Sequence, residues 1–237
     1  MGGSAAERVA TITLTPGPLA DFGAPACEAL RASLTKLAQD PPRALFVDAM
    51  EGVGAAEPRY PTPVGLVDPA AQLAAFPAPT VAVWDGPALG AGAEVLLAAD
   101  IRVIGERATM TFPEVDAGEL PCWGGTQRLT RAAGIALALR MLVVGDVASA
   151  EMLERSGVAM CTGDPRARSL EVVARLATGA PRAQAAAREA VLRGRDLTLA
   201  DGHRLESDLN LLLSTTRDRA EGIAAFFEKR PPEFEGE

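Results

Sequence analysis

Short apolar runs that alternate with helical segments restrict the fold of this chain more than any other feature. Residues 9–14, 43–48 and 80–85 are rich in β-branched and aromatic side chains, and proline or glycine lies close to each run. Runs of this kind are typical of buried strands in a parallel sheet. Between the first two runs, residues 24–37 place leucines at helical spacing before an Asp-Pro-Pro sequence that ends a helix. This order predicts an α/β fold.

The composition is that of a globular chain and excludes several other classes. Of the 237 residues, 48% are hydrophobic and 23% are charged, which suffices for one sizeable core. The formal net charge is −8 without a basic cluster, so we expect no nucleic-acid partner. The longest apolar runs, residues 95–99 and 136–144, are shorter than the roughly 20 residues that cross a bilayer, and we expect no membrane-spanning helix.

The cysteine and histidine content indicates a reducing compartment and no metal site. Cys27, Cys122 and Cys161 are widely and irregularly spaced, and His203 is the single histidine. The sequence therefore offers neither a disulfide framework nor a metal-ligand pattern. Residues 1–6 lack the basic patch and apolar core of a secretory signal, and we expect a cytoplasmic protein.

The last part of the chain, from Gly125 onward, has mostly helical periodicity. We divide the chain into a mixed core, residues 1–180, and a C-terminal helical region, residues 181–237. Leucines recur at helical spacing in this region, at Leu197, Leu205, Leu209, Leu212 and Leu213. Such a stripe is typical of a core or a subunit contact.

A glycine-rich segment and two glutamates form the candidate site that the residues themselves indicate. Residues 86–92 follow a predicted strand and lead into the apolar residues 93–99, so we expect a turn whose backbone N–H groups face a ligand at a helix start. Glu94 and Glu114 both lie in apolar surroundings. Burial raises the pKa of a carboxyl, and such a group can exchange protons near neutral pH.

A simpler interpretation stays open for each of these features. The same pattern fits glutamates that are exposed or paired with an arginine. The glycines also depart from the dinucleotide-binding spacing Gly-x-Gly-x-x-Gly, because the next glycine after Gly92 is Gly105. A glycine-rich turn of this kind can simply mark a chain reversal.

Several motifs in a fixed order resemble one known family. They read DGPALGAGAE at residues 85–94, AADIRV at 98–103, FPEV at 112–115, GGTQRL at 124–129, GD at 145–146, ASA at 148–150 and RAEGIAAFFEKR at 219–230. Together they resemble the enoyl-CoA hydratase/isomerase (crotonase) superfamily. The resemblance is strong from residue 81 to residue 159, recurs near the C-terminus and is only topological further upstream.

This resemblance implies a spiral of ββα units with the thioester site in residues 1–180. Residues 181–237 would form a helical region that mediates trimerisation, as a homotrimer or a dimer of trimers, and that is able to contact coenzyme A. The implied substrate is an acyl thioester of coenzyme A, as in fatty acid metabolism, or of a carrier protein. Coenzyme A enters as part of the substrate, and neither a separate cofactor nor a metal is expected.

The resemblance also assigns roles to three residues of the glycine-rich region and its surroundings. It places a backbone N–H that holds the thioester oxygen on Ala91 and the two hydratase glutamates on Glu94 and Glu114. A chain with both glutamates is expected to hydrate a 2-enoyl thioester or to dehydrate its product. An enoyl isomerase that uses mainly Glu114, or a thioester decarboxylase, stays open.

Cys122 and Trp123 lie in the loop that lines the acyl pocket in the family. The position of Cys122 carries an extra acidic residue in dienoyl-thioester isomerases, so a cysteine there argues against that chemistry. The bulky Trp123 is expected to shorten or flatten the pocket and to favour a small or planar acyl group.

Two upstream segments and the C-terminal basic pair affect whether the expected thioester is one of coenzyme A or one of a carrier protein. Residues 50–58 replace the family's second oxyanion segment, with Gly54 or Ala55 as its donor, and residues 16–22 lack the usual basic and asparagine residues. Because of these departures, the substrate can be a thioester of a carrier protein as well as one of free coenzyme A. They also permit a non-catalytic, auxiliary subunit of a polyketide pathway. Lys229 and Arg230 match a pair that reaches a neighbour's nucleotide, or simply end a solvated helix.

Overall fold

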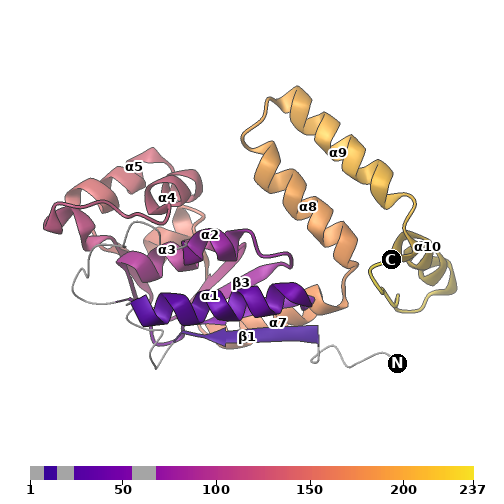
Figure 1. Cartoon of the computed structure of the whole chain (residues 1–237), viewed down its shortest axis with the longest axis horizontal. Coiled ribbons are helices and arrows are strands. Elements are labelled where there is room, and N and C mark those ends of the chain that lie inside the picture. Colours follow the sequence, from indigo (N-terminus) through magenta and orange to yellow (C-terminus); the bar gives the residue numbers. More distant parts are fainter. Residues whose placement is uncertain (1–7, 15–23, 55–67) are drawn as a thin grey trace.

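The computed structural model describes residues 8–14, 24–54 and 68–237 of the chain, which form two sheets covered by helices (Figure 1). The larger sheet contains, in spatial order, β1 (Val9–Thr13), β2 (Ala44–Asp48), β3 (Thr80–Trp84), β5 (Ile101–Ile104) and β8 (Met160–Cys161). The smaller sheet contains β4 (Pro87–Leu89), β6 (Thr109–Thr111) and β7 (Ala148–Ser149). Every pairing in the larger sheet is parallel, whereas β6 and β7 pair antiparallel.

The first helices connect consecutive strands, and the last part of the chain is mostly helical. They are α1 (Ala24–Gln39), α2 (Pro69–Ala74), α3 (Gly90–Ala98), the 3₁₀ turn η2 (Pro113–Ala117), α4 (Gly125–Ala133), α5 (Ile135–Leu139), the π-helical turn η3 (Arg140–Val144), α6 (Ala150–Arg155), α7 (Pro165–Thr178), α8 (Pro181–Gly194), α9 (Leu199–Leu213) and α10 (Arg217–Glu228). The predicted α/β class and the mostly helical pattern after Gly125 are confirmed.

One predicted turn is a strand for part of its length. Residues 87–89 of the expected glycine-rich turn form β4, which pairs with β6. The backbone explains this: the Val53 N–H donates to the Pro87 carbonyl at 2.7 Å and the Leu89 N–H donates to the Val53 carbonyl at 2.9 Å. A proline is tolerated at the start of so short a strand. The helix α3 then begins at Gly90, inside the expected turn and three residues before the apolar stretch.

The larger sheet is buried on both faces by different helices. Leu45 and Val47 of β2 share a core with α1, whereas the alternate residue Phe46 packs with Val173 of α7. Each residue of β2 and β3 is buried, which is why these strands read as continuous apolar runs in the sequence.

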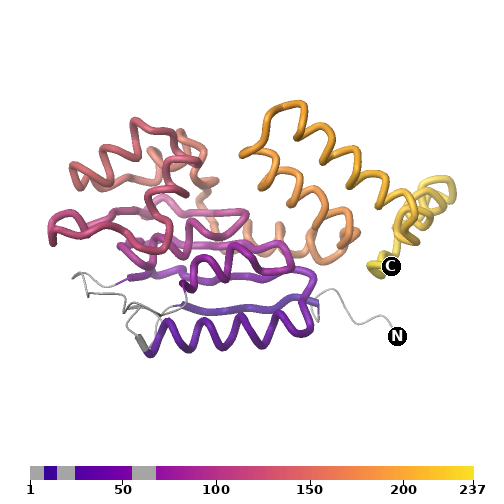
Figure 2. The backbone as a smooth tube through the Cα atoms, turned by 45° about the horizontal axis from the view of Figure 1, so that its top comes forward, coloured from indigo at the N-terminus to yellow at the C-terminus, as the bar shows by residue number. Residues whose placement is uncertain are grey.

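The C-terminal helices stand apart from the sheets. In Figures 1 and 2, α8 and α9 form an antiparallel hairpin that projects from the sheet, and α10 lies beyond it. Neither α8 nor α9 contains a buried residue. In the predicted leucine stripe, Leu205, Leu209 and Leu213 are half-buried, but Leu212 is 68% exposed. This stripe is therefore not a core of the single chain, and a subunit contact stays a prediction.

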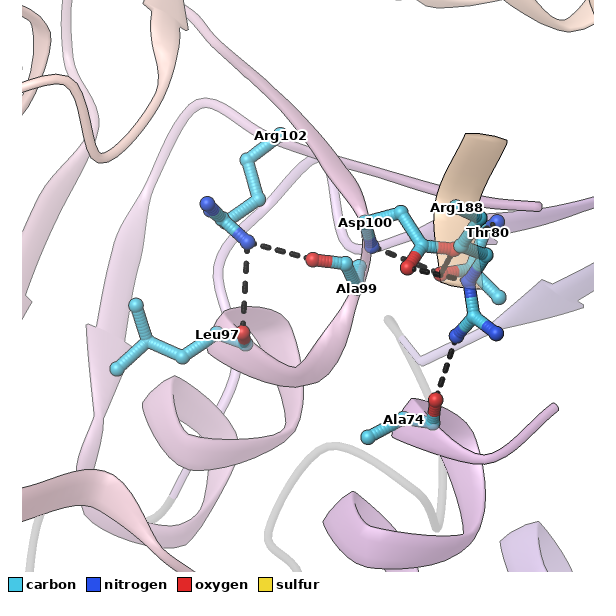
Figure 3. Close-up of polar contacts among 7 residues, drawn as sticks. All are labelled: Ala74, Thr80, Leu97, Ala99, Asp100, Arg102 and Arg188. Carbon is cyan, nitrogen blue, oxygen red and sulfur yellow. Dashed lines mark hydrogen bonds and ion pairs between the residues drawn. The ribbon is translucent and has the colours of Figure 1, made fainter. Parts of the chain in front are cut away.

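A polar junction ties α8 to the core (Figure 3). Asp100, at the end of α3, accepts hydrogen bonds from the Thr80 N–H and hydroxyl at 2.8 and 2.9 Å through one oxygen. Its other oxygen accepts from the Arg188 Nε of α8 at 2.7 Å, and Arg188 also donates to the Ala74 carbonyl. Because Arg188 and Asp100 are only 21% and 15% exposed, solvent screens this ion pair less than a surface pair.

Arg102 holds the same end of α3 from the next strand. Its guanidinium donates to the Leu97 and Ala99 carbonyls (Figure 3) and to the Val158 carbonyl at 2.6 Å. Burial lowers the pKa of this guanidinium. The C-terminal carbonyls of α3 thereby obtain partners that the helix itself cannot supply.

Within the ranges that the structure describes, no helix combines the length and the apolar character that a bilayer crossing requires.

We predict that Arg188→Ala lowers the free energy of unfolding by about 2–3 kcal/mol, because it leaves the shielded Asp100 carboxylate without its cation. Arg193→Ala, on the same helix, is the control, since its ion pair with Glu189 is exposed and is worth about 0.5 kcal/mol or less. Urea unfolding of the three proteins measures the difference. Equal losses in the two variants would contradict the prediction.

Candidate active site

Glu94 is a buried carboxylate in an apolar helix. Helix α3 begins at Gly90, whose φ of +47° favours glycine, and its residues are buried almost throughout. Glu94 lies one turn further on and is 1% exposed. A carboxylate in this position requires hydrogen-bond donors, because burial of an unpaired charge costs several kcal/mol.

Two backbone N–H groups of a neighbouring turn supply these donors. Glu94 Oε1 accepts from the Trp123 N–H at 2.8 Å and from the Gly125 N–H at 2.7 Å. Gly124 between them adopts a left-handed conformation with φ of +87°. A side chain on Gly125 would place its Cβ 2.9 Å from Glu94 Oε1, so the close approach requires glycine.

Opposing effects place the pKa of Glu94 near neutrality. The pKa rises from 4.5 to about 7 as the net result: burial is the main cause of the rise, and the N–H groups of Gly125 and Trp123 oppose it. The nearby charges of Glu114 and Asp68 raise the pKa further. Glu94 can therefore both accept and return a proton near pH 7.

Glu114 approaches the first turn of α3 from β6, the neighbour in the smaller sheet of β4, which leads into α3. It follows β6 in the turn η2, where Pro113 provides a favoured helix start, and it is 2% exposed. A Cβ on Gly90 would lie 2.7 Å from Glu114 Oε1. Glu114 thus lies beside the first residue of α3 and Glu94 lies one turn further along the same helix, near enough for the charge of Glu114 to raise the pKa of Glu94, although twenty positions of sequence separate them.

The same helix start offers backbone donors. The first N–H groups of an α-helix have no partner within the helix, and Ala91 stands in this first turn half-buried. Lys229 is the one described non-glycine residue with a positive φ. The φ of Ala91 is therefore negative, and alanine at this position causes no backbone strain. The expected Ala91 donor is therefore compatible with its local conformation.

The altered upstream segment also reaches this point. Val53 pairs with Ala88 of β4 in a parallel bridge. A Cβ on Gly92 would lie 2.9 Å from the Gly54 backbone nitrogen, so this segment packs directly against α3. Gly54, one of the two expected second donors, is thus beside the helix start, whereas Ala55 lies outside the described residues, as do residues 16–22.

The loop residues differ from each other in exposure. Trp123 is 5% exposed and belongs to the main apolar core, while Cys122 is exposed. The backbone of Trp123 has a role that the sequence pattern alone does not predict, because its N–H donates to Glu94. The adjacent glycines at the start of α4, Gly124 and Gly125, are the one sign of it in the sequence. A contact of either side chain with an acyl group stays a prediction.

The C-terminal basic pair has internal partners. Arg230 donates to both oxygens of Glu221, at 2.6 and 2.8 Å, and to Glu228 at 2.6 Å. The hydrogen bond from Arg230 is the main cause that lowers the pKa of Glu221 to about 2. Lys229 is exposed and ends α10 in a left-handed conformation. A contact of this pair with a nucleotide stays a prediction.

Comparison with known proteins is consistent with this geometry. A family model described as Enoyl-CoA hydratase/isomerase matches residues 64–237. The 2,3-dehydroadipyl-CoA hydratase of Escherichia coli (strain K12) is 38% identical over 169 residues, 70% of this chain and 66% of that protein. The enoyl-CoA hydratase domain-containing protein 2, mitochondrial, of Bos taurus is 40% identical over 175 residues, 70% of this chain and 58% of that protein. The chain thus spans less than two thirds of the length of these curated relatives.

A solved structure extends the similarity over almost the whole chain. The crystal structure of an enoyl-CoA hydratase from Bacillus anthracis superposes with a TM-score of 0.87 and 27% identity, covering 97% of this chain and 96% of that chain. The expected crotonase-like fold is therefore confirmed.

We predict that the protein loses stability as pH rises from about 4.5 to about 7, because the folded state holds the Glu94 proton more tightly than the unfolded state does. The loss amounts to about 3 kcal/mol, as each pKa unit corresponds to about 1.4 kcal/mol. Glu94→Gln removes this component, whereas the exposed Glu28→Gln keeps it. Urea unfolding at several pH values measures the three curves, and parallel curves for wild type and Glu94→Gln would contradict the assignment.

Proposed function

Because the chain belongs to the enoyl-CoA hydratase/isomerase family, we propose that it adds water to an α,β-unsaturated acyl thioester or removes water from the hydroxyacyl product. The observation that carries this proposal is the placement of two buried carboxylates on the N-terminal half of α3: Glu114 lies beside Gly90, and Glu94, one turn further on, has its pKa raised in part by the charge of Glu114. Hydration needs one group that handles water and another that exchanges a proton with carbon. Two carboxylates in one apolar site meet this requirement.

Backbone N–H groups would stabilise the negative charge that develops on the thioester oxygen. The Ala91 N–H in the first turn of α3 is the first donor, and the helix dipole adds to its effect. The segment that contains Gly54 packs beside it and is suited to supply a second donor. Donors fixed before the reaction need no reorganisation when the enolate forms.

The two glutamates would then divide the proton transfers. Glu94, with its pKa of about 7, positions and activates water by accepting a proton as the C–O bond forms at the β-carbon. Glu114 donates a proton to the α-carbon as the enolate collapses. In the reverse direction Glu114 removes the α-proton and Glu94 returns a proton to the departing hydroxide, so charges and protons balance.

A coenzyme A thioester is the substrate class that we favour, since the relatives are named for such substrates. The thioester itself carries the coenzyme, so the reaction requires no separate cofactor. We also propose a subunit contact through α9 and α10, because Leu211, Leu212, Phe226 and Phe227 are each more than two-thirds exposed. The family resemblance favours a homotrimer or a dimer of trimers for this assembly.

We predict that the purified protein hydrates crotonyl-CoA, measured as the loss of the enoyl-thioester absorbance. Glu94→Gln and Glu114→Gln are each expected to lower kcat by about 10²-fold or more, since each removes a proton-transfer group. Glu119→Gln is the matched control, because Glu119 is a half-buried carboxylate five residues after Glu114. It is expected to stay within about twofold of wild type.

Two results would contradict this function. Full activity in either glutamine variant at position 94 or 114 would exclude the assigned role. Thioester binding without turnover in the wild type, indifferent to both substitutions, would instead indicate an auxiliary binding subunit.

A further inference from the structure

The turn that holds Glu94 is itself held from the opposite side by Arg128. This arginine lies on α4, one turn after the helix begins, and is half-buried. Its guanidinium donates to the Trp123 carbonyl, and its backbone N–H donates to the Gly124 carbonyl at 2.8 Å. One residue therefore binds two successive carbonyls of the turn.

These contacts alternate with the contacts to Glu94 along three consecutive peptide units. The first unit points its N–H, that of Trp123, at Glu94. The second presents the Trp123 carbonyl to the Arg128 guanidinium. The third binds Glu94 through the Gly125 N–H and Arg128 through the Gly124 carbonyl. The Arg128 guanidinium thus fixes the 123–124 peptide unit, which lies between the two units whose N–H groups donate to Glu94. The Arg128 backbone N–H also binds the carbonyl of the 124–125 unit.

The Arg128 guanidinium also packs against the glycine at the centre of this turn. Gly124, the residue that caps α4, has no side chain with which to cap it and adopts φ of +87°. A Cβ at this position would lie 2.5 Å from an Arg128 guanidinium nitrogen, so the guanidinium packs tightly over the glycine. Glycine is conformationally permissive, and the Arg128 guanidinium restricts this position in addition to the core packing of the Trp123 side chain.

We propose that Arg128 is a positioning residue of this site: its guanidinium locks the 123–125 turn so that the Trp123 and Gly125 N–H groups both point at Glu94. The expected effect of Arg128 on turnover rests on the proposed function, whereas its expected effect on the pKa of Glu94 does not. Arg128 acts through the turn and is not assigned a contact with substrate.

The electrostatic consequence follows from the groups that face Glu94. Glu114 from η2 and Asp68 from the start of α2 both disfavour its ionised form, and the two N–H groups favour that form. A loosened turn weakens the favourable side alone. The pKa of Glu94 then rises, and a larger fraction of the enzyme holds Glu94 protonated and unable to activate water at neutral pH.

The experiment compares Arg128→Met with Arg131→Met. Both remove a guanidinium from α4 and keep an unbranched side chain, but the Arg131 guanidinium binds Gln127 and Asp196 and not the 123–125 turn. With crotonyl-CoA, Arg128→Met is expected to lower kcat about tenfold with little change in KM and to shift the acidic limb of the kcat profile upward by about 0.5–1 pH unit. Arg131→Met stays close to wild type, and Arg128→Lys restores part of the loss.

A second readout does not require turnover. The ¹³C NMR shift of the Glu94 carboxyl carbon, identified by its absence in Glu94→Gln, gives the pKa of Glu94 in each folded variant. We expect Arg128→Met to raise this pKa by about 0.5–1 unit and Arg128→Lys to raise it less. An unchanged pKa in Arg128→Met overturns the proposal, even if stability or activity falls. If the wild type hydrates no thioester, the proposed function fails, and the titration still decides the role of Arg128.

Discussion

The structure around the site depends on one constraint, the burial of the Glu94 carboxylate inside an apolar helix. An ionised carboxylate in such surroundings is stable only with directed donors. The 123–125 turn supplies two of them, so α3 and α4 are joined through this side chain as well as through apolar contact. Glycines at positions 124 and 125 follow from the same constraint, because the Arg128 guanidinium and the Glu94 carboxylate occupy the space that a Cβ would need; at Gly90 the Glu114 carboxylate occupies it.

The rest of the fold holds α3 at both ends. At its start, β4 pairs with β6 and with Val53, which brings Glu114 and the Gly54 segment to the same turn. At its end, Arg102 binds the last carbonyls and Asp100 joins Thr80 to Arg188. The helix that carries Glu94 is therefore fixed by polar contacts from two strands and from α8. Preorganisation of this kind is what electrostatic stabilisation of an enolate requires.

Sequence patterns predicted the elements whose physical cause is local. The strands β2 and β3 were predictable because burial on both faces requires unbroken apolar runs. Glu94 and Glu114 were predictable as candidates because each stands in an apolar context. The strand β4 was not, since three residues carry no periodicity and its pairing with Val53 is a long-range contact. The backbone donors of Trp123 and Gly125 and the contact of Arg128 depend on the path of one turn, which side-chain identities do not specify.

The division of labour between the glutamates is tested most directly by deuterium exchange at the α-carbon of a saturated thioester, butyryl-CoA, in D₂O. This exchange requires enolate stabilisation and a base at the α-carbon but no attack by water. With these roles, wild type and Glu94→Gln are expected to incorporate deuterium, whereas Glu114→Gln is expected to lose the exchange by about 10²-fold or more. Exchange that survives in Glu114→Gln and disappears in Glu94→Gln would contradict the assigned roles.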